Sequence, residues 1–261
     1  MRILICVGSN RRNGNTDRIV GLIAAELRSL ADQHQAPLEV ETLHLGSVEI
    51  NPCRGCRACF DRGVDKCPLK DDLLEVKGKM VQADGLLVAS PVYVDDVSGL
   101  TKNWIDRLAH VCHRPEFAGK CAYLVATTGS TPAGHALGTL FTALSTWGFH
   151  IAGQAGFKMG ALTAPDQVES RHGPRARTVA RQLFTAIHKK AAAYPSLRAL
   201  AVFRIQQRYW QAAEQSSLDY RIWRERGWLD PRCSFYAPNK AGALKVALAR
   251  LAGSAISGFV S

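Results

Sequence analysis

The chain has 261 residues, of which 47% are hydrophobic and 21% are charged, with 22 glycines and 11 prolines. This balance is typical of soluble globular proteins and excludes the disordered and fibrous classes. The net charge of +11 is uneven, because residues 165–261 hold 16 of the 33 basic residues but only 6 of the 22 acidic ones. The length favours one α/β domain followed by a basic extension.

Five apolar runs predict strands, at residues 2–7, 38–45, 85–90, 121–126 and 150–156. Apolar residues at helical spacing predict helices between and after them, at residues 16–34, 71–82, 98–111, 133–147 and 174–193. Strands that alternate with helices form a parallel, doubly wound sheet, whose ligands lie beyond the carboxyl ends of the strands. We therefore expect a first domain at 1–193 with a cysteine-rich insertion at 51–70.

The pattern changes after Pro195, where residues 197–228 and 240–258 read as helices on either side of a turn that ends at Pro231. We interpret residues 194–261 as a basic helical extension. In its last helix an apolar stripe runs beside basic residues, and the stripe is formed by Leu244, Ala247, Leu248 and Leu251. Such a face can lie on an anionic membrane or cover an apolar patch of a neighbouring subunit, and we favour the subunit.

The longest stretch without a charged residue, 121–157, is interrupted by a turn cluster at 128–134, so we expect no transmembrane span. The apolar run at the N-terminus is too short for a signal peptide, and we expect the protein in the cytoplasm. Eight cysteines in a reducing compartment do not form a disulfide framework. Nucleic-acid binding is not expected.

The loop from Gly8 to Thr16 reads G-S-N-R-R-N-G-N-T and joins the first strand to the first helix. A helix N-terminus with free backbone amides, small polar side chains and an arginine suits a phosphate. The loop matches neither the Walker pattern nor G-x-G-x-x-G, which disfavours an ADP-bearing cofactor bound in the Rossmann manner. A single terminal phosphate fits better.

A second motif, P-V-Y-V-D-D-V-S-G-L-T-K-N-W-I-D-R, follows the third strand and begins at Pro91. Together with the loop it resembles the flavodoxin-like NADPH-dependent FMN reductases, over about residues 1–190. The positions that carry the resemblance are Gly8, Ser9, Arg11, Pro91, Tyr93, Ser98, Gly99, Lys102, Asp106 and Arg107. For the last two we favour an ion pair along the helix that positions nothing.

The resemblance implies a flavodoxin-like sheet with strand order 2-1-3-4-5 and an FMN cofactor. It implies that the FMN phosphate is held by Ser9, Arg11, Asn15 and Thr16. The flavin ring and its edges would then meet Pro91, Val92, Tyr93, Val94, Ser98, Thr127, Thr128, Gly129 and Ser130. No side chain is singled out as a catalytic acid or base.

Four cysteines, Cys53, Cys56, Cys59 and Cys67, have the spacing C-x2-C-x2-C-x7-C. Thiols this close together suit a four-iron cluster better than tetrahedral zinc, which usually takes two separated pairs. The spacing also resembles the cysteine motif of the iron-sulfur flavoproteins, a branch of the same family. Unligated or redox-regulatory thiols remain an alternative.

Basic residues around these cysteines are expected to lower the pKa values of the thiols; they are Arg54, Arg57, Arg62 and Lys66. We expect the cluster near the carboxyl ends of the strands. We interpret His110 and His113 as capping or surface residues rather than metal ligands. Cys6, Cys121 and Cys233 are assigned to packing.

The sequence thus predicts an FMN-dependent oxidoreductase that passes electrons from NAD(P)H or a ferredoxin-like donor to a small acceptor, with a four-iron cluster and a homo-oligomeric state, a dimer or tetramer. The alternatives are a cluster-free NAD(P)H-dependent FMN or quinone reductase and a non-enzymatic electron carrier.

Overall fold

The computed structural model describes residues 1–160 and 167–257. Its sheet has five parallel strands, which are β1 (Arg2–Val7), β2 (Glu39–His44), β3 (Gly85–Tyr93), β5 (Cys121–Thr128) and β6 (His150–Lys158). Their spatial order is β2-β1-β3-β5-β6. A sixth strand that the sequence did not predict, β4 (Asp96–Val97), pairs antiparallel with the end of β3.

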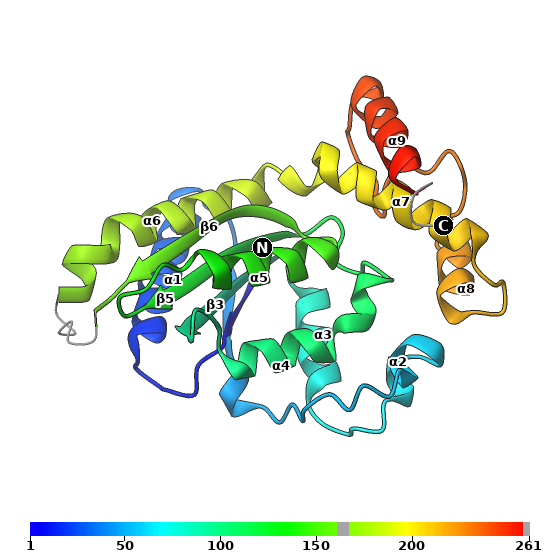
Figure 1. The fold of residues 1–261 in the computed structure, drawn as a ribbon. Helices are drawn as coiled ribbons and strands as arrows, with labels where there is room; N and C mark the ends of the chain where they lie inside the picture. The colour runs from blue at the N-terminus through cyan, green and yellow to red at the C-terminus, as the bar shows by residue number, and fades with distance from the viewer. Residues whose placement is uncertain (161–166, 258–261) are drawn as a thin grey trace.

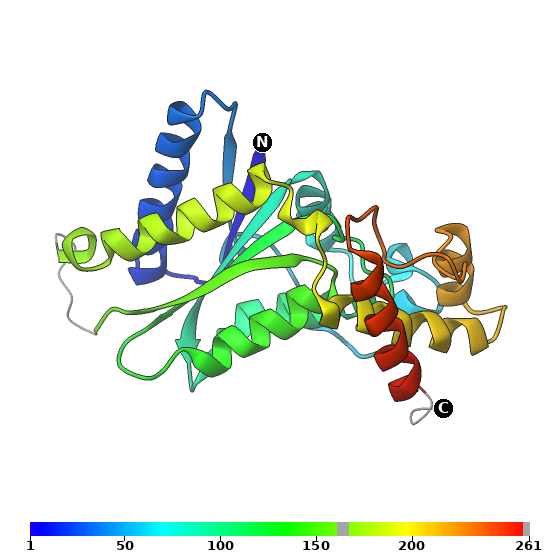
Figure 2. The same cartoon turned by 90° about the horizontal axis from the view of Figure 1, so that it is seen from above.

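Helices cover both faces of the sheet, so the predicted α/β class is confirmed (Figure 1, Figure 2). One face is covered by α1 (Asn15–Gln33) and α6 (Gln167–His188), and the other by α3 (Leu73–Gln82), α4 (Gly99–Arg107) and α5 (Gly134–Thr146). The period of two in β1 explains this arrangement. Ile3 and Ile5 pack under α1, whereas Leu4 and Cys6 pack under α3.

Four short 3-10 turns interrupt the connections, at Leu45–Ser47, Val64–Lys66, Ala109–Cys112 and Ala191–Ala193. The predicted helix 98–111 is therefore shorter than expected, because α4 ends at Arg107. By contrast, α6 begins before its expected start and carries Pro174 inside the helix. β3 and β5 also continue past their expected ends, through Tyr93 and Thr128.

The C-terminal extension consists of α7 (Leu197–Ala212), α8 (Leu218–Glu225) and α9 (Ala243–Ser257). The predicted helix 197–228 is two helices, since Ser217 caps the start of α8 by accepting a hydrogen bond from the amide of Tyr220. The three helices share an apolar cluster whose buried members are Leu200, Phe203, Trp210, Trp223, Trp228, Phe235 and Ala249.

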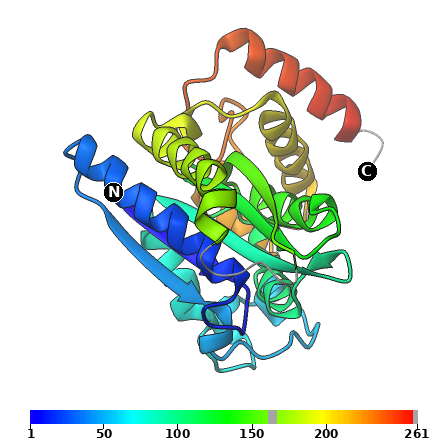
Figure 3. The ribbon, with the colours of Figure 1, turned by 90° about the vertical axis from the view of Figure 1, so that its left-hand side faces the viewer.

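The extension lies beyond the end of the sheet at which β6 begins, and α9 packs on the side of α7 away from the sheet (Figure 1, Figure 3). The short helix α2 (Ala58–Asp61) of the cysteine-rich segment lies near α8. Within residues 1–160 and 167–257, no helix is both long and apolar enough to cross a membrane.

Candidate functional site

The loop after β1 is fixed tightly against the start of α4. The amide of Gly8 donates to the carbonyl of Ala89 at 2.8 Å, and the carbonyl of Gly8 accepts from the hydroxyl of Ser98 at 2.6 Å. A Cβ atom at Gly8 would lie 1.8 Å from the hydroxyl oxygen of Thr101. Only glycine lets the two segments approach this closely.

The first turn of α1 has free amides at the carboxyl end of β1. Its N-cap residue, Gly14, makes no side-chain capping bond. Among the described residues the amides of Asn15 and Thr16 have no acceptor, and the guanidinium of Arg11 has no partner. A helix N-terminus with unpaired amides beside a cation is suited to an anion.

Thr16 joins this loop to the carboxyl end of β5. Its hydroxyl lies 2.7 Å from the hydroxyl of Thr127, and both residues are buried. Ser9 is also buried and accepts a hydrogen bond from the amide of Arg11 at 3.1 Å. The predicted phosphate residues therefore surround one helix terminus.

β3 and β4 form a hairpin at the same end of the sheet. Val92 pairs with Val97, and the turn residues Val94 and Asp95 have positive φ angles of 48° and 64°. Valine rarely adopts this conformation, and Val94 is fully exposed at 102% while Tyr93 is 51% exposed. A strained, exposed apolar turn at a strand end is typical of a ligand contact.

The segment 127–130 completes this strand-end crevice, the name used below for the region bounded by residues 8–16, 91–98 and 127–130. The carbonyls of Thr128 and Gly129 accept from the amides of Met159 and Gly160. The amides of Gly129 and Ser130 have no acceptor among the described residues.

Two hydrogen-bonded groups at the crevice were not predicted from the sequence. His44 at the end of β2 bonds to Asp17 at 2.9 Å and to Arg12 at 2.6 Å. Below Ser98, the hydroxyls of Ser90 and Thr101 lie 3.1 Å apart. His44 is 27 and 32 residues away from its two partners in the sequence, and the pairing of β1 with β2 brings them together.

The four predicted cysteine ligands line one cavity of about 90 Å³. Cys53 and Cys56 are exposed, whereas Cys59 and Cys67 are partly buried. In the part of the chain that the structure describes, no three His, Cys, Asp or Glu side chains are close enough to hold a single metal ion. A shared cavity rather than a tight tetrahedron suits a multi-iron cluster, which is larger than one ion.

Arg107 supports this cavity from the end of α4. It is 5% exposed and donates to the carbonyl of Asn51, to both carboxylate oxygens of Asp71 and, at 3.9 Å, to the sulfur of Cys67. Burial raises the pKa of Asp71, but the hydrogen bond and charge of Arg107, together with hydrogen bonds from the amides of Asn51 and Leu73, outweigh burial, and the net pKa is lowered. The predicted ion pair between Asp106 and Arg107 is wrong, because Asp106 pairs with Lys102.

Arg114 links the C-terminal extension to the cysteine-rich segment. This residue is 4% exposed and donates to the carbonyls of Cys59 and Phe60 and to the carboxylate of Asp219 in α8. His113 bonds to the second oxygen of Asp219 at 2.9 Å. Asp219 of the extension, which lies more than a hundred residues away in the sequence, thus holds the backbone at Cys59 in place through Arg114.

The expected lowering of the thiol pKa values does not hold for Cys59. Burial raises the pKa of this thiol. Two of the four nearby cations are engaged elsewhere, since Arg57 pairs with Asp61 at 3.2 Å and Lys66 with Asp65 at 2.8 Å.

Other side-chain predictions have mixed outcomes. Cys6 and Cys121 are buried in the sheet core, and Cys233 packs against the extension cluster, as expected. His110 is not a surface residue, because it is 1% exposed beneath Lys77. Burial, with Lys77 as a second cause, lowers its pKa to about 3.

The cysteine cavity does not adjoin the strand-end crevice, contrary to expectation. Ser98, at the start of α4, lies in the crevice, whereas Arg107, at its end, lines the cavity. Nine residue steps along the helix separate the two, which corresponds to about 13 Å. Helix α4 therefore connects two distinct sites of one chain.

Comparison with known proteins shows which family this chain belongs to. Residues 1–163, which include the crevice and all four cysteines, match the family model described as NADPH-dependent FMN reductase. The chain belongs to the NADPH-dependent FMN reductase family. It is accordingly an FMN-dependent oxidoreductase, and proteins named iron-sulfur flavoproteins are among its relatives.

Relatives of this FMN reductase family member include an iron-sulfur flavoprotein of Archaeoglobus fulgidus, 27% identical over 234 residues, which are 88% of this chain and 100% of that protein. An iron-sulfur flavoprotein of Methanocaldococcus jannaschii is 38% identical over 107 residues, covering 41% of this chain and 51% of that protein. The chain thus spans all of the first relative and about half of the second.

Solved structures share the fold. A flavone reductase superposes with a TM-score of 0.57 at 18% identity, over 72% of this chain and 63% of that chain. RosB, solved with bound 8-demethyl-8-formylriboflavin-5'-phosphate, superposes with a TM-score of 0.54 at 14% identity over 90% of both chains. The second superposition extends beyond the residues of the family model.

Proposed function

We propose that the strand-end crevice holds FMN, and that the chain uses it to pass electrons from NAD(P)H to a small acceptor. Two observations of this site fit FMN. The unpaired amides of Asn15 and Thr16 and the free guanidinium of Arg11 suit its phosphate, and the exposed apolar surface of Tyr93 and Val94 suits its ring. The uncapped helix terminus in a chain of this family carries the proposal.

In this proposal Ser9, Arg11 and the first turn of α1 bind the phosphate, and the pair Thr16–Thr127 fixes the loop to the sheet. The hairpin residues from Pro91 to Val94 orient the ring. The amides of Gly129 and Ser130 donate to its edge, while Ser98 holds the loop backbone at Gly8. When bound, FMN supplies hydride acceptance and the delivery of electrons one or two at a time.

An absorption spectrum tests this function. Purified, flavin-loaded protein should show about one FMN per chain, and NADPH should bleach the flavin band. Thr16→Val removes a hydroxyl from the loop and should weaken FMN binding about tenfold or more. Thr178→Val is the matched control, since its exposed hydroxyl bonds only within α6. Colourless protein, or equal FMN affinity in the two variants, contradicts the assignment.

We propose further that Cys53, Cys56, Cys59 and Cys67 hold a four-iron cluster that exchanges single electrons with a donor such as a ferredoxin-like protein. Their shared cavity supports this, as do two donors to sulfur, the Gly55 amide on Cys53 at 3.5 Å and Arg107 on Cys67. Anaerobic protein should contain about four iron and four sulfide per chain.

Cys67→Ser should lose most of the iron, whereas Cys233→Ser, a partly buried thiol outside the cavity, should keep it. Zinc in place of iron, or iron that survives Cys67→Ser, contradicts the cluster. A cluster-free reductase remains the second candidate function and would show flavin turnover without iron.

We also propose a homo-oligomer. The cysteine cavity and the strand-end crevice are apart within one chain, but the cavity of one subunit could lie next to the crevice of another. The stripe on α9 stays exposed, at 76% for Leu244, 49% for Leu248 and 71% for Leu251. Lys245 and Arg250 bond instead to backbone carbonyls of the extension. Sedimentation should show a dimer or tetramer, and salt-sensitive flotation with anionic liposomes would favour the membrane.

A further inference from the structure

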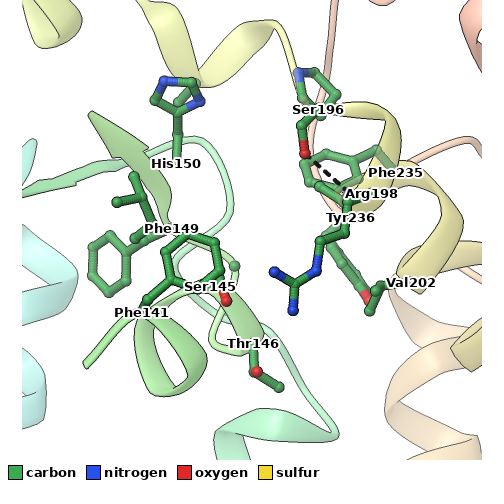
Figure 4. Close-up of a pocket in the computed structure, with 15 residues that line it drawn as sticks. Phe141, Ser145, Thr146, Phe149, His150, Ser196, Arg198, Val202, Phe235 and Tyr236 are labelled. Atoms are coloured by element: carbon green, nitrogen blue, oxygen red, sulfur yellow. Dashed lines mark hydrogen bonds between the residues drawn. The ribbon is translucent and has the colours of Figure 1, made fainter. Parts of the chain in front are cut away.

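A separate cavity of about 270 Å³ lies between the sheet and the extension (Figure 4). It is bounded by the end of α5, the start of β6, the first turns of α7 and the segment of Phe235 and Tyr236. None of its lining residues belongs to the strand-end crevice or to the cysteine cavity. Its size approaches that of typical small-molecule sites.

This cavity is far from the proposed flavin. It lies at His150, where β6 begins, whereas the crevice lies at the carboxyl ends of the strands, near Lys158. Eight residue steps at about 3.3 Å each separate the two ends by about 26 Å. A molecule bound here cannot touch the flavin and is therefore not its redox substrate.

The walls of the cavity are aromatic and preformed. Phe149 stacks on Phe117 with ring centroids 4.8 Å apart, and the hydroxyl of Tyr236 donates to Gln206 at 2.8 Å. Phe141 and Phe235 supply two further rings. Rigid aromatic faces favour a flat apolar ligand, because little ordering is needed on binding.

The polar groups of the cavity select for negative charge. No lining residue is acidic, and the guanidinium of Arg198 extends into the cavity (Figure 4), 5.2 Å from the centre of the Phe141 ring. Arg198 has no carboxylate partner within the described ranges. The imidazole of His150 likewise has no hydrogen-bond partner there, and burial lowers its pKa below the ordinary value, which favours the neutral ring as a donor or acceptor.

We propose that this cavity binds a small aromatic carboxylate, with its ring between Phe141, Phe149 and Tyr236 and its carboxylate at Arg198. Such a ligand contacts the sheet domain and the extension at once. It therefore stabilises the docking of the extension, which also carries the Asp219 anchor of the cysteine segment.

Calorimetric titration of the flavin-loaded chain with 2-naphthoate, and with the neutral 2-naphthamide, tests the site. We expect one binding event per chain, tighter for the acid, unaffected by NADPH and accompanied by a higher melting temperature. Arg198→Gln should weaken naphthoate binding about fivefold and remove the preference for the acid. Arg208→Gln, an exposed cation on the same helix, should change nothing.

Filling the cavity provides the second test. Val202→Trp should abolish binding, and Ser145→Trp, from the opposite wall, serves if the first variant does not fold. The proposal is overturned by an absence of binding at millimolar naphthoate, by equal affinity for acid and amide, by full binding in a folded tryptophan variant, or by release of FMN on titration.

Discussion

Removing the carboxylate of Asp219 should damage the cysteine segment from a distance. In Asp219→Ala the guanidinium of Arg114 stays 4% exposed and loses its counter-charge. Breaking a buried ion pair on one side costs about 3–5 kcal/mol, and we expect about 3 because the carbonyls of Cys59 and Phe60 still accept from Arg114. That is a large part of the stability of an ordinary domain.

Urea unfolding and iron analysis measure both consequences. The matched control is Asp230→Ala in the same extension, whose partner Arg232 is 91% exposed, so its loss should change the stability little. We expect Asp219→Ala to lower the free energy of unfolding and the iron content together. Equal stability of the two variants, with full iron in both, would refute the anchoring role of Asp219.

Three further outcomes are expected. Arg107→Met leaves Asp71 buried without its cation, so it should lose iron and about 3–5 kcal/mol of stability; unchanged iron and urea midpoint would speak against this. Since burial lowers the pKa of His110 to about 3, the unfolded chain binds a proton below about pH 6.5 that the native chain excludes. Stability should therefore fall by about 2 kcal/mol from pH 8 to pH 5, and His110→Gln should flatten that slope. Gly8→Ala places a methyl group 1.8 Å from a buried hydroxyl, so it should lower the stability by about 1–3 kcal/mol and weaken FMN binding. Gly138→Ala is the control and should stabilise α5, because there is open space around its Cβ. Equal melting temperatures of the two variants would contradict the packing at the loop.

The sheet could be predicted because local signals agree with tertiary burial. Residues 2–7 and 121–126 are apolar runs that the structure buries on both faces, and the loop at Gly8 stands at a strand-to-helix junction recognisable from its glycines and polar residues. The hairpin of β3 and β4 escaped prediction because its turn uses Val94 and Asp95, neither of which signals positive φ as glycine does.

The supports of the cysteine cavity could not be predicted for a different reason. Nothing in the sequence pattern marks Arg107, inside the predicted helix 98–111, or Arg114, just beyond it, and their partners Asp71 and Asp219 lie 36 and 105 residues away. Only the folded chain pairs them. The roles of the individual crevice residues and the domain boundary at 193/194 stay predictions.

Because Asp219 follows the four cysteines in the sequence, the cysteine segment is synthesised before the residue that anchors it. The cysteines precede Asp219 by about 150 residues, which a ribosome adds in about 8–30 s at about 5–20 residues per second. During that interval the four thiols are present, but the loop that carries them lacks the contact between Arg114 and Asp219. For the proposed cluster, iron delivered before Asp219 is made would meet a segment that Arg114 and Asp219 do not yet hold, so the proposed site would form completely only in the finished chain.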